Sequence, residues 1–141
     1  MTSSFNRNSA RAIAQAAHDK AAELGIAVTV AVVAPDASPI LVDRMDGARA
    51  VTVRLAIGKA KAAALWGQPS GDLATRFESA PQLTSALISQ WDGEFVAVGG
   101  AVPLEIDGIE LGAVGVSGGS AAQDVECATH AAALIAEMLP Q

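Results

Sequence analysis

The stretch that most constrains the fold is an apolar run that ends in glycines, residues 112–120, with the sequence GAVGVSGGS. Its small and β-branched residues predict a buried strand, and the pair Gly118 and Gly119 predicts a tight corner after it. A helical pattern begins directly behind this corner. Backbone N–H groups at such a position can be left unpaired and can bind an anion. The corner is therefore the first candidate for a binding site.

Helices are predicted where apolar residues recur at helical spacing. Three long ones cover residues 9–24, 48–66 and 121–139, and two short ones cover residues 70–79 and 81–90. The helix over residues 48–66 is apolar on two opposite sides. We expect one side to meet the sheet and the other to meet another helix, for which a second subunit is a candidate.

Strands are predicted from short apolar runs bounded by turn residues. They cover residues 26–34, 40–45, 95–98, 101–106 and 109–116. The dipeptide Asp107–Gly108 between the last two is typical of a two-residue hairpin. The order helix, two strands, helices, three strands, helix predicts an α+β fold with a profilin-like layering. We expect a single domain over residues 1–141, in which helices flank a five-stranded, mainly antiparallel sheet.

Charge and hydropathy disfavour nucleic-acid-binding and membrane proteins and favour an oligomer. The formal net charge is −6 and no block of lysine or arginine occurs, which disfavours duplex nucleic acid as a partner. Neither an apolar leader segment nor a run of membrane-span length is found, so we expect a cytoplasmic protein without membrane association. Only 17% of the residues are charged, which favours a homo-oligomer that hides further apolar surface.

Charged side chains on two earlier segments are suited to the glycine corner. Arg44 and Asp46 lie at the end of the first predicted hairpin, and Lys59 lies on the helix over residues 48–66. The planar guanidinium of Arg44 is suited to holding a carboxylate. We expect these residues to line one small-molecule site together with the corner. The alternative is an ion pair between Arg44 and Asp46 that only stabilises the end of the hairpin.

The corner itself offers both binding and proton-transfer groups. The N–H groups of Ser117, Gly118 and Gly119 are predicted to bind an anionic oxygen. Lys59 or Asp124, in the first turn of the last helix, is a candidate to move a proton. The alternatives are that the glycines only allow a tight turn and that Asp124 only interacts with the helix dipole. No metal site is predicted, and Cys127 is interpreted as a packing residue.

Several segments in a fixed order resemble one family. They are RMDGA at residues 44–48, KAKAA at 59–63, GG at 99–100 with VPL at 102–104, LGAVGVSGG at 111–119 and QD at 123–124. The chain resembles the GlcG/HbpS-like family (DUF336), which includes haem-binding sensors, glycolate-operon proteins and a domain of some corrinoid adenosyltransferases. The resemblance implies a five-stranded antiparallel sheet flanked by helices, assembly into dimers or octamers, and tetrapyrrole binding in some members.

Two classes of function follow from these observations. The first is a small-molecule binding protein that holds haem or another anionic cofactor, with carboxylates near Arg44 and residues 117–119. Haem needs an axial ligand, and the two histidines, His18 and His130, are both interpreted as surface residues. The alternative is a cofactor-independent lyase or isomerase that acts next to a carbonyl on a small carboxylate in a catabolic pathway. An assembly or regulatory subunit without a ligand is a third possibility.

Overall fold

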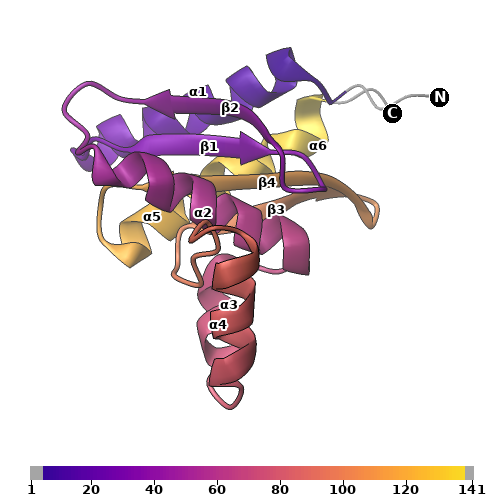
Figure 1. The fold of residues 1–141 in the computed structure, drawn as a ribbon. Helices are drawn as coiled ribbons and strands as arrows, with labels where there is room; N and C mark the ends of the chain where they lie inside the picture. The colour runs from indigo at the N-terminus through magenta and orange to yellow at the C-terminus, as the bar shows by residue number, and fades with distance from the viewer. Residues whose placement is uncertain (1–4, 139–141) are drawn as a thin grey trace.

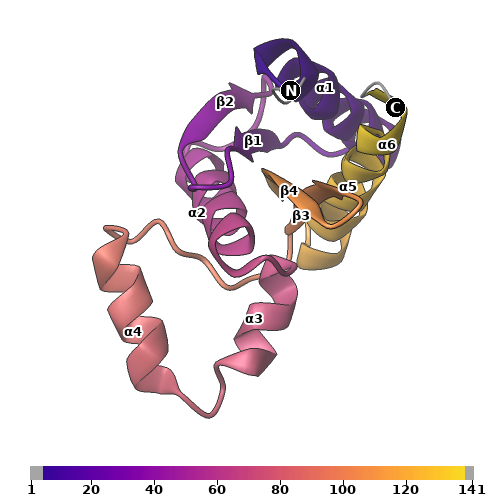
Figure 2. The ribbon, with the colours of Figure 1, turned by 90° about the vertical axis from the view of Figure 1, so that its right-hand side faces the viewer.

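Four strands form one antiparallel sheet with helices on both faces (Figures 1 and 2). The computed structural model describes residues 5–138. Its elements are α1 (Arg7–Leu24), β1 (Thr29–Val33), β2 (Pro39–Arg44), α2 (Val51–Trp66), α3 (Ser70–Arg76), α4 (Pro81–Gln90), β3 (Ala101–Ile106), β4 (Ile109–Ser117), α5 (Ala121–Ala133) and α6 (Ile135–Met138). The α+β class, the antiparallel sheet and the flanking helices are thus as predicted.

The strand order β2-β1-β4-β3 places the two hairpins side by side. Thr29 at the start of β1 lies opposite Arg44 of β2 on one side and Ser117 of β4 on the other. The predicted turn between β3 and β4 is confirmed, because Asp107 and Gly108 both have positive φ, at 52° and 79°. Pro103 is accommodated because β3 lies at the edge of the sheet, where one side of the strand needs no partner.

The two faces of the sheet differ in side-chain size, and this decides which helices pack on each face. Large side chains such as Val30, Val32 and Val114 pack with Ile13 of α1 and Cys127 of α5 in one buried cluster. The other face carries smaller side chains and packs against α2. Its buried cluster consists of Ala31, Val33, Ala56, Ala60, Ala63, Ala64, Ala101 and Ala113. Figure 2 shows the result, with α1 and α5 on one side of the sheet and α2 on the other.

Helix α2 approaches the sheet closely because both partners are small at the contact. A Cβ atom on Gly115 would lie 2.5 Å from the carbonyl oxygen of Ala56 and 3.0 Å from Cβ of Ala60. The prediction that α2 is buried on two sides is confirmed for this side. Its second apolar side, for which the sequence made a second subunit a candidate partner, packs on α3 and on residues 95–97 of the same chain.

The prediction of five strands is wrong, because residues 95–98 form no strand. Phe95 is buried beside the rings of Phe77 and Trp66, with centroid distances of 6.4 and 6.5 Å. The N–H of Val96 donates to the carbonyl of Gly58 on α2, over 3.1 Å. The segment therefore directs its polar backbone toward a helix. A short apolar run is compatible with either arrangement.

Element boundaries differ at both ends of the chain. Helix α1 begins at Arg7, two residues before the predicted start, because Asn6 caps it by accepting from the N–H of Ser9. The predicted last helix is divided at Leu134 into α5 and α6, and its predicted end at residue 139 lies outside the described residues.

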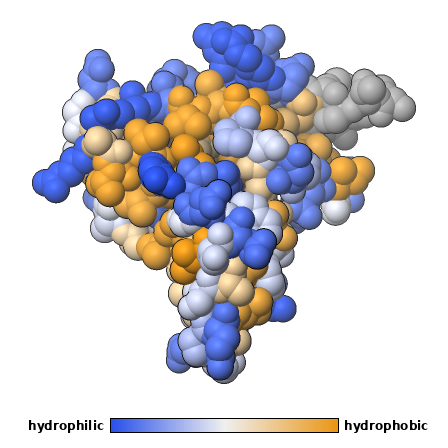
Figure 3. All heavy atoms as spheres, in the orientation of Figure 1, coloured by the Kyte–Doolittle hydropathy of each residue, from blue (hydrophilic) through white to orange (hydrophobic). Residues whose placement is uncertain are grey.

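Helices α3 and α4 form an arm that projects from the layered body (Figure 1). Helix α4 contains no buried residue, whereas α3 is attached to the body by Ser70 and Leu73, which are both buried. The Ser70 hydroxyl donates to the carbonyl of Val98 and accepts from the N–H of Ala101. In Figure 3 hydrophobic atoms gather over the sheet and α2 more than at the tip of the arm.

Gly25 and Gly112 allow the cost of backbone strain to be measured apart from the cost of steric overlap. Gly112 and Gly25 both have positive φ, but a Cβ atom on Gly112 would overlap the carbonyl of Val33, whereas nothing lies within 4 Å of one on Gly25. We expect Gly25→Ala to lower the free energy of unfolding by about 1 kcal/mol through strain alone. Gly112→Ala should lower it by about 3 kcal/mol or more, because overpacking is added. Urea denaturation measures both, and equal effects would contradict the packing described here.

The reactivity of the Cys127 thiol reports whether the core between α1, α5 and the sheet is closed to solvent. Its side chain is fully buried, and burial raises the pKa of its thiol to about 11, with a further contribution from the charge of Asp124. Because the thiolate is the reactive form, we expect no reaction with a disulfide reagent at pH 8 in the folded protein. In urea the thiol should react stoichiometrically. Immediate reaction of the native protein would show that this part of the core is open.

Candidate functional site

The glycine corner is built by hydrogen bonds within its own residues. Ser120 caps α5, since its hydroxyl accepts from the N–H of Gln123 and its own N–H donates to the Gln123 side chain. The N–H of Gly119 donates to Oδ1 of Asp124 over 2.8 Å. The N–H groups of residues 119 and 120 are therefore already paired, so an anion would have to displace a side chain to reach them.

Lys59 and Asp124 form a buried ion pair directly beneath this corner. Nζ of Lys59 lies 3.1 Å from Oδ2 of Asp124 and also donates to the carbonyl of Val116 over 3.0 Å. The two residues are only 4% and 2% exposed. The pair joins α2 to the end of β4 and to the first turn of α5. Two ions in such a position need each other, because each carries a large desolvation cost.

Gly100 provides the room for the Lys59 side chain. A Cβ atom on Gly100 would lie 2.8 Å from Nζ of Lys59 and 2.6 Å from the carbonyl of Val116. Its φ of +141° is also a conformation that other residues rarely adopt. The glycine pair at residues 99–100, interpreted in the sequence as part of a family motif, thus permits the buried ion pair.

A pocket of about 290 Å³ opens beside this ion pair, and we call it the corner pocket. It is lined by Leu55, Lys59, Val96, Val98, Ser117, Gly119, Ala121 and Asp124. Four residues expected at one site are thus together: Lys59, Ser117, Gly119 and Asp124. Gly118 does not line the pocket and is turned toward Ala27, whose carbonyl blocks any side chain there.

Arg44 and Asp46 lie outside the corner pocket. The guanidinium of Arg44 is exposed and donates twice to the carbonyl of Ala48 in its own loop, over 3.0 and 2.8 Å. Asp46 is exposed in the same loop. Although Arg44 and Ser117 flank the same residue, Thr29, the arginine side chain is directed to the loop that precedes α2.

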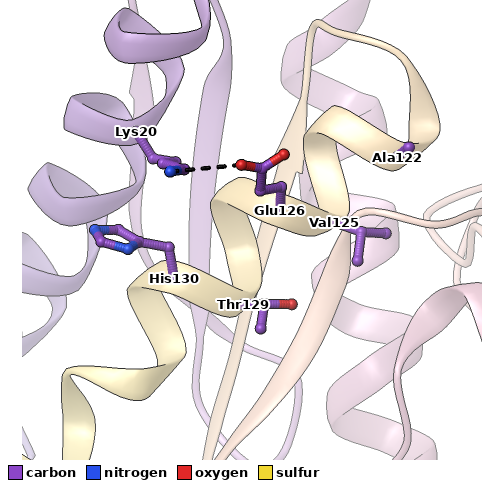
Figure 4. A pocket seen from close by; sticks show the side chains of 6 residues that line it. All are labelled: Lys20, Ala122, Val125, Glu126, Thr129 and His130. Carbon is purple, nitrogen blue, oxygen red and sulfur yellow. Dashed lines mark ion pairs between the residues drawn. The ribbon is translucent and has the colours of Figure 1, made fainter.

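A second depression lies between α1 and α5, on the opposite side of the sheet from α2 (Figure 4). This α1–α5 groove, of about 420 Å³, is lined by Lys20, Ala122, Val125, Glu126, Thr129 and His130. Lys20 forms ion pairs with Glu23 at 3.1 Å and with Glu126 at 3.4 Å. The hydrogen bond to Glu23 raises the pKa of Lys20, so the groove contains a permanent cation near neutral pH.

The two histidines have different environments. His130 is exposed at the edge of the α1–α5 groove, as predicted for a surface residue (Figure 4). The same interpretation is wrong for His18, which is only 8% exposed and places Nε2 3.0 Å from Oδ2 of Asp43 on β2. The groove was missed in the sequence because Lys20 and His130 are 110 positions apart, and no local pattern connects them.

The described residues set further limits on the kind of site. Within residues 5–138, no three His, Cys, Asp or Glu side chains gather in a way that could hold a metal ion. Over the same range, no helix combines the length and the apolar character needed to cross a bilayer.

The fold and the two depressions define a small α+β protein with two candidate sites for a small molecule. The model of the HbpS-like family, described as "Haem degrading protein HbpS-like", matches residues 5–133. The chain belongs to this family. A 15.0 kDa protein of the dhaT-dhaS intergenic region of Citrobacter freundii is 30% identical over 115 residues, covering 82% of this chain and 80% of the relative.

Other relatives include larger proteins and solved structures. The corrinoid adenosyltransferase PduO of Salmonella typhimurium is 32% identical over 123 residues, or 87% of this chain, but the match spans only 36% of PduO. The crystal structure of Klebsiella pneumoniae protein ORFY (DUF336) has a TM-score of 0.87 at 26% identity and covers 98% of this chain and 94% of ORFY. A crystal structure of PduOC in complex with haem has a TM-score of 0.81 at 30% identity, with coverages of 92% and 93%.

The Lys59–Asp124 pair provides a stability test. Lys59→Met leaves a buried carboxylate without its cation, so we expect a loss of about 3–5 kcal/mol in the free energy of unfolding. Asp124→Asn should cost a comparable amount, because it leaves the ammonium unpaired. The double variant should be more stable than the sum of the two losses predicts, by at least about 1 kcal/mol. Urea denaturation of all four proteins measures this coupling, and simple additivity would show that the two ions do not depend on each other.

Proposed function

We propose that this chain binds haem, or another flat cofactor with carboxylates, in the α1–α5 groove. The observation that carries the proposal is that an exposed imidazole, a cation and an exposed apolar side chain line one depression, supplied by His130, Lys20 and Val125. The family relationship and the haem complex of PduOC support haem as the first ligand to test. Bound haem would supply an iron centre whose chemistry its axial ligand adjusts.

The residues of the groove fit haem in three respects. His130 offers an axial nitrogen, Lys20 offers a charge for a carboxylate, and Ala122 and Val125 offer apolar contact for the ring. Glu126 already pairs with Lys20, so a cofactor carboxylate would compete with it. Because the groove is open, one face of the ring would remain uncovered. We propose that a second copy of the chain covers it, within an assembly between a dimer and an octamer.

The corner pocket fits haem less well. Its lining contains no histidine, cysteine, methionine or tyrosine, which are the usual axial ligands. The sequence-based expectation that cofactor carboxylates meet Arg44 and residues 117–119 also requires Arg44 to leave the carbonyl of Ala48. The groove is therefore the better candidate for haem. The expectations of a cytoplasmic location and of no nucleic-acid partner stay predictions.

A haemin titration tests the proposal. We expect a saturable shift of the haem absorption band with one haem per chain, and His130→Ala should weaken binding by about tenfold or more, since it removes the iron ligand. His18→Ala is the matched control and should bind haemin normally, because His18 faces Asp43 away from the groove. Loss of binding in the His18 variant, with normal binding by the His130 variant, would contradict the groove as the haem site.

A second candidate function is favoured by the buried ion pair in the corner pocket. The lyase or isomerase considered from the sequence needs a base and an acid beside a bound carbonyl, and Asp124 and Lys59 meet there at 3.1 Å. Ser117 lies in the same lining and adds a hydroxyl. Such an enzyme would need no cofactor. The haem proposal and this one use different pockets, so one can fail without the other.

A further inference from the structure

The charges of the corner pocket balance within its own lining. Lys59 and Asp124 are the charged residues that line it, and each neutralises the other at 3.1 Å. Arg44, expected to hold a carboxylate at this site, is instead bound to the carbonyl of Ala48. A carboxylate that entered the pocket would therefore meet no uncompensated cation and would lie beside the charge of Asp124. Like charges at a buried site repel strongly.

Donors for a single neutral oxygen are nevertheless available. A lysine ammonium has three N–H donors, and Lys59 uses two of them for Val116 and Asp124. The hydroxyl of Ser117 has no hydrogen-bond partner among the described residues, although the residue is only 4% exposed and lines the pocket. Because this hydroxyl faces the pocket and has no partner within residues 5–138, it can donate to a bound acceptor. The remaining wall is apolar, formed by Leu55, Val96 and Val98.

We infer that the corner pocket selects a short-chain neutral carbonyl compound, a ketone or an aldehyde, over the small carboxylate considered from the sequence. The inference rests on the second candidate function above and narrows its substrate class. The carbonyl oxygen accepts from Lys59 and Ser117, and the alkyl group lies against the apolar wall. This arrangement gives the Ser117 hydroxyl and the third Lys59 donor a partner and adds no net charge.

The same arrangement defines a proton transfer without a co-reactant. The carboxylate of Asp124 takes a proton from the carbon next to the carbonyl, and the electron pair of that C–H bond forms the C=C bond of an enolate. The carbonyl π electrons move onto the oxygen, where the donors of Lys59 and Ser117 stabilise the negative charge. Return of a proton to carbon restores the ketone, and in heavy water this proton is replaced by deuterium. Nothing is oxidised or reduced.

Butanone and 2-oxobutanoate form a matched pair of probes, because the second carries a carboxylate where the first has a methyl group. We expect the protein to accelerate deuterium exchange at the CH₂ group of butanone by at least about tenfold over buffer, measured by proton NMR. The acceleration for 2-oxobutanoate, relative to its own rate in buffer, should be smaller. Preference for 2-oxobutanoate would overturn the inference while leaving the lyase or isomerase function intact. No acceleration with either probe would overturn both.

Variants separate chemistry from folding. Ser117→Ala should retain the fold and reduce the acceleration with butanone by about tenfold or more, because one oxyanion donor is lost. Leu55→Phe should block the pocket without touching the ion pair, whereas Leu83→Phe, on the exposed surface of α4, should leave exchange unchanged. Full exchange activity in Ser117→Ala or in Leu55→Phe would show that the exchange does not occur in the corner pocket.

Discussion

The close contact between α2 and the sheet is the constraint on which the rest of the structure depends. It exists because the sheet presents small residues such as Gly115 and Ala113 on that face. Helix α2 packs against them with its own small residues Ala56 and Ala60. A helix held at this distance places the side chain of Lys59 beneath the end of β4, within reach of the Val116 carbonyl. A larger residue at the contact would move the helix outward, and the lysine would no longer reach its partners.

The buried pair of Lys59 and Asp124 connects this packing to the chemistry of the chain. Buried ion pairs usually add little net stability compared with apolar packing, because desolvation offsets their attraction. The two residues, at 4% and 2% exposure, also line the corner pocket, and the second candidate function proposes a role for them there. The pair also occupies the donors of the corner, since Asp124 accepts from Gly119. The corner thus acts less as an open anion site than as a rigid support for two side chains.

Helix α5 contributes to both candidate sites. Asp124 faces the corner pocket, while Val125, the next residue, is part of the lining of the α1–α5 groove. Farther along the same helix, Glu126 and His130 lie on the groove side. Cys127 of this helix is buried in the core. One helix therefore separates the groove proposed for haem from the pocket proposed for a small carbonyl compound. The two proposals share an element but no side chain on which either depends.

Local chemistry in the sequence was sufficient for the hairpin around Asp107 and Gly108, for the bounds of α4 and for the glycine that ends α1, because turns and caps depend on neighbouring residues. It also assigned Lys59, Ser117 and Asp124 to one site. Only the tertiary structure decided that residues 95–98 pack Phe95 beside α2 and α3 instead of adding a strand, since a short apolar run is compatible with both arrangements. Only the tertiary structure also showed that Arg44 binds its own loop and that Lys20 and His130 line one groove. Contacts between distant segments follow from packing and leave no periodic signal along the chain.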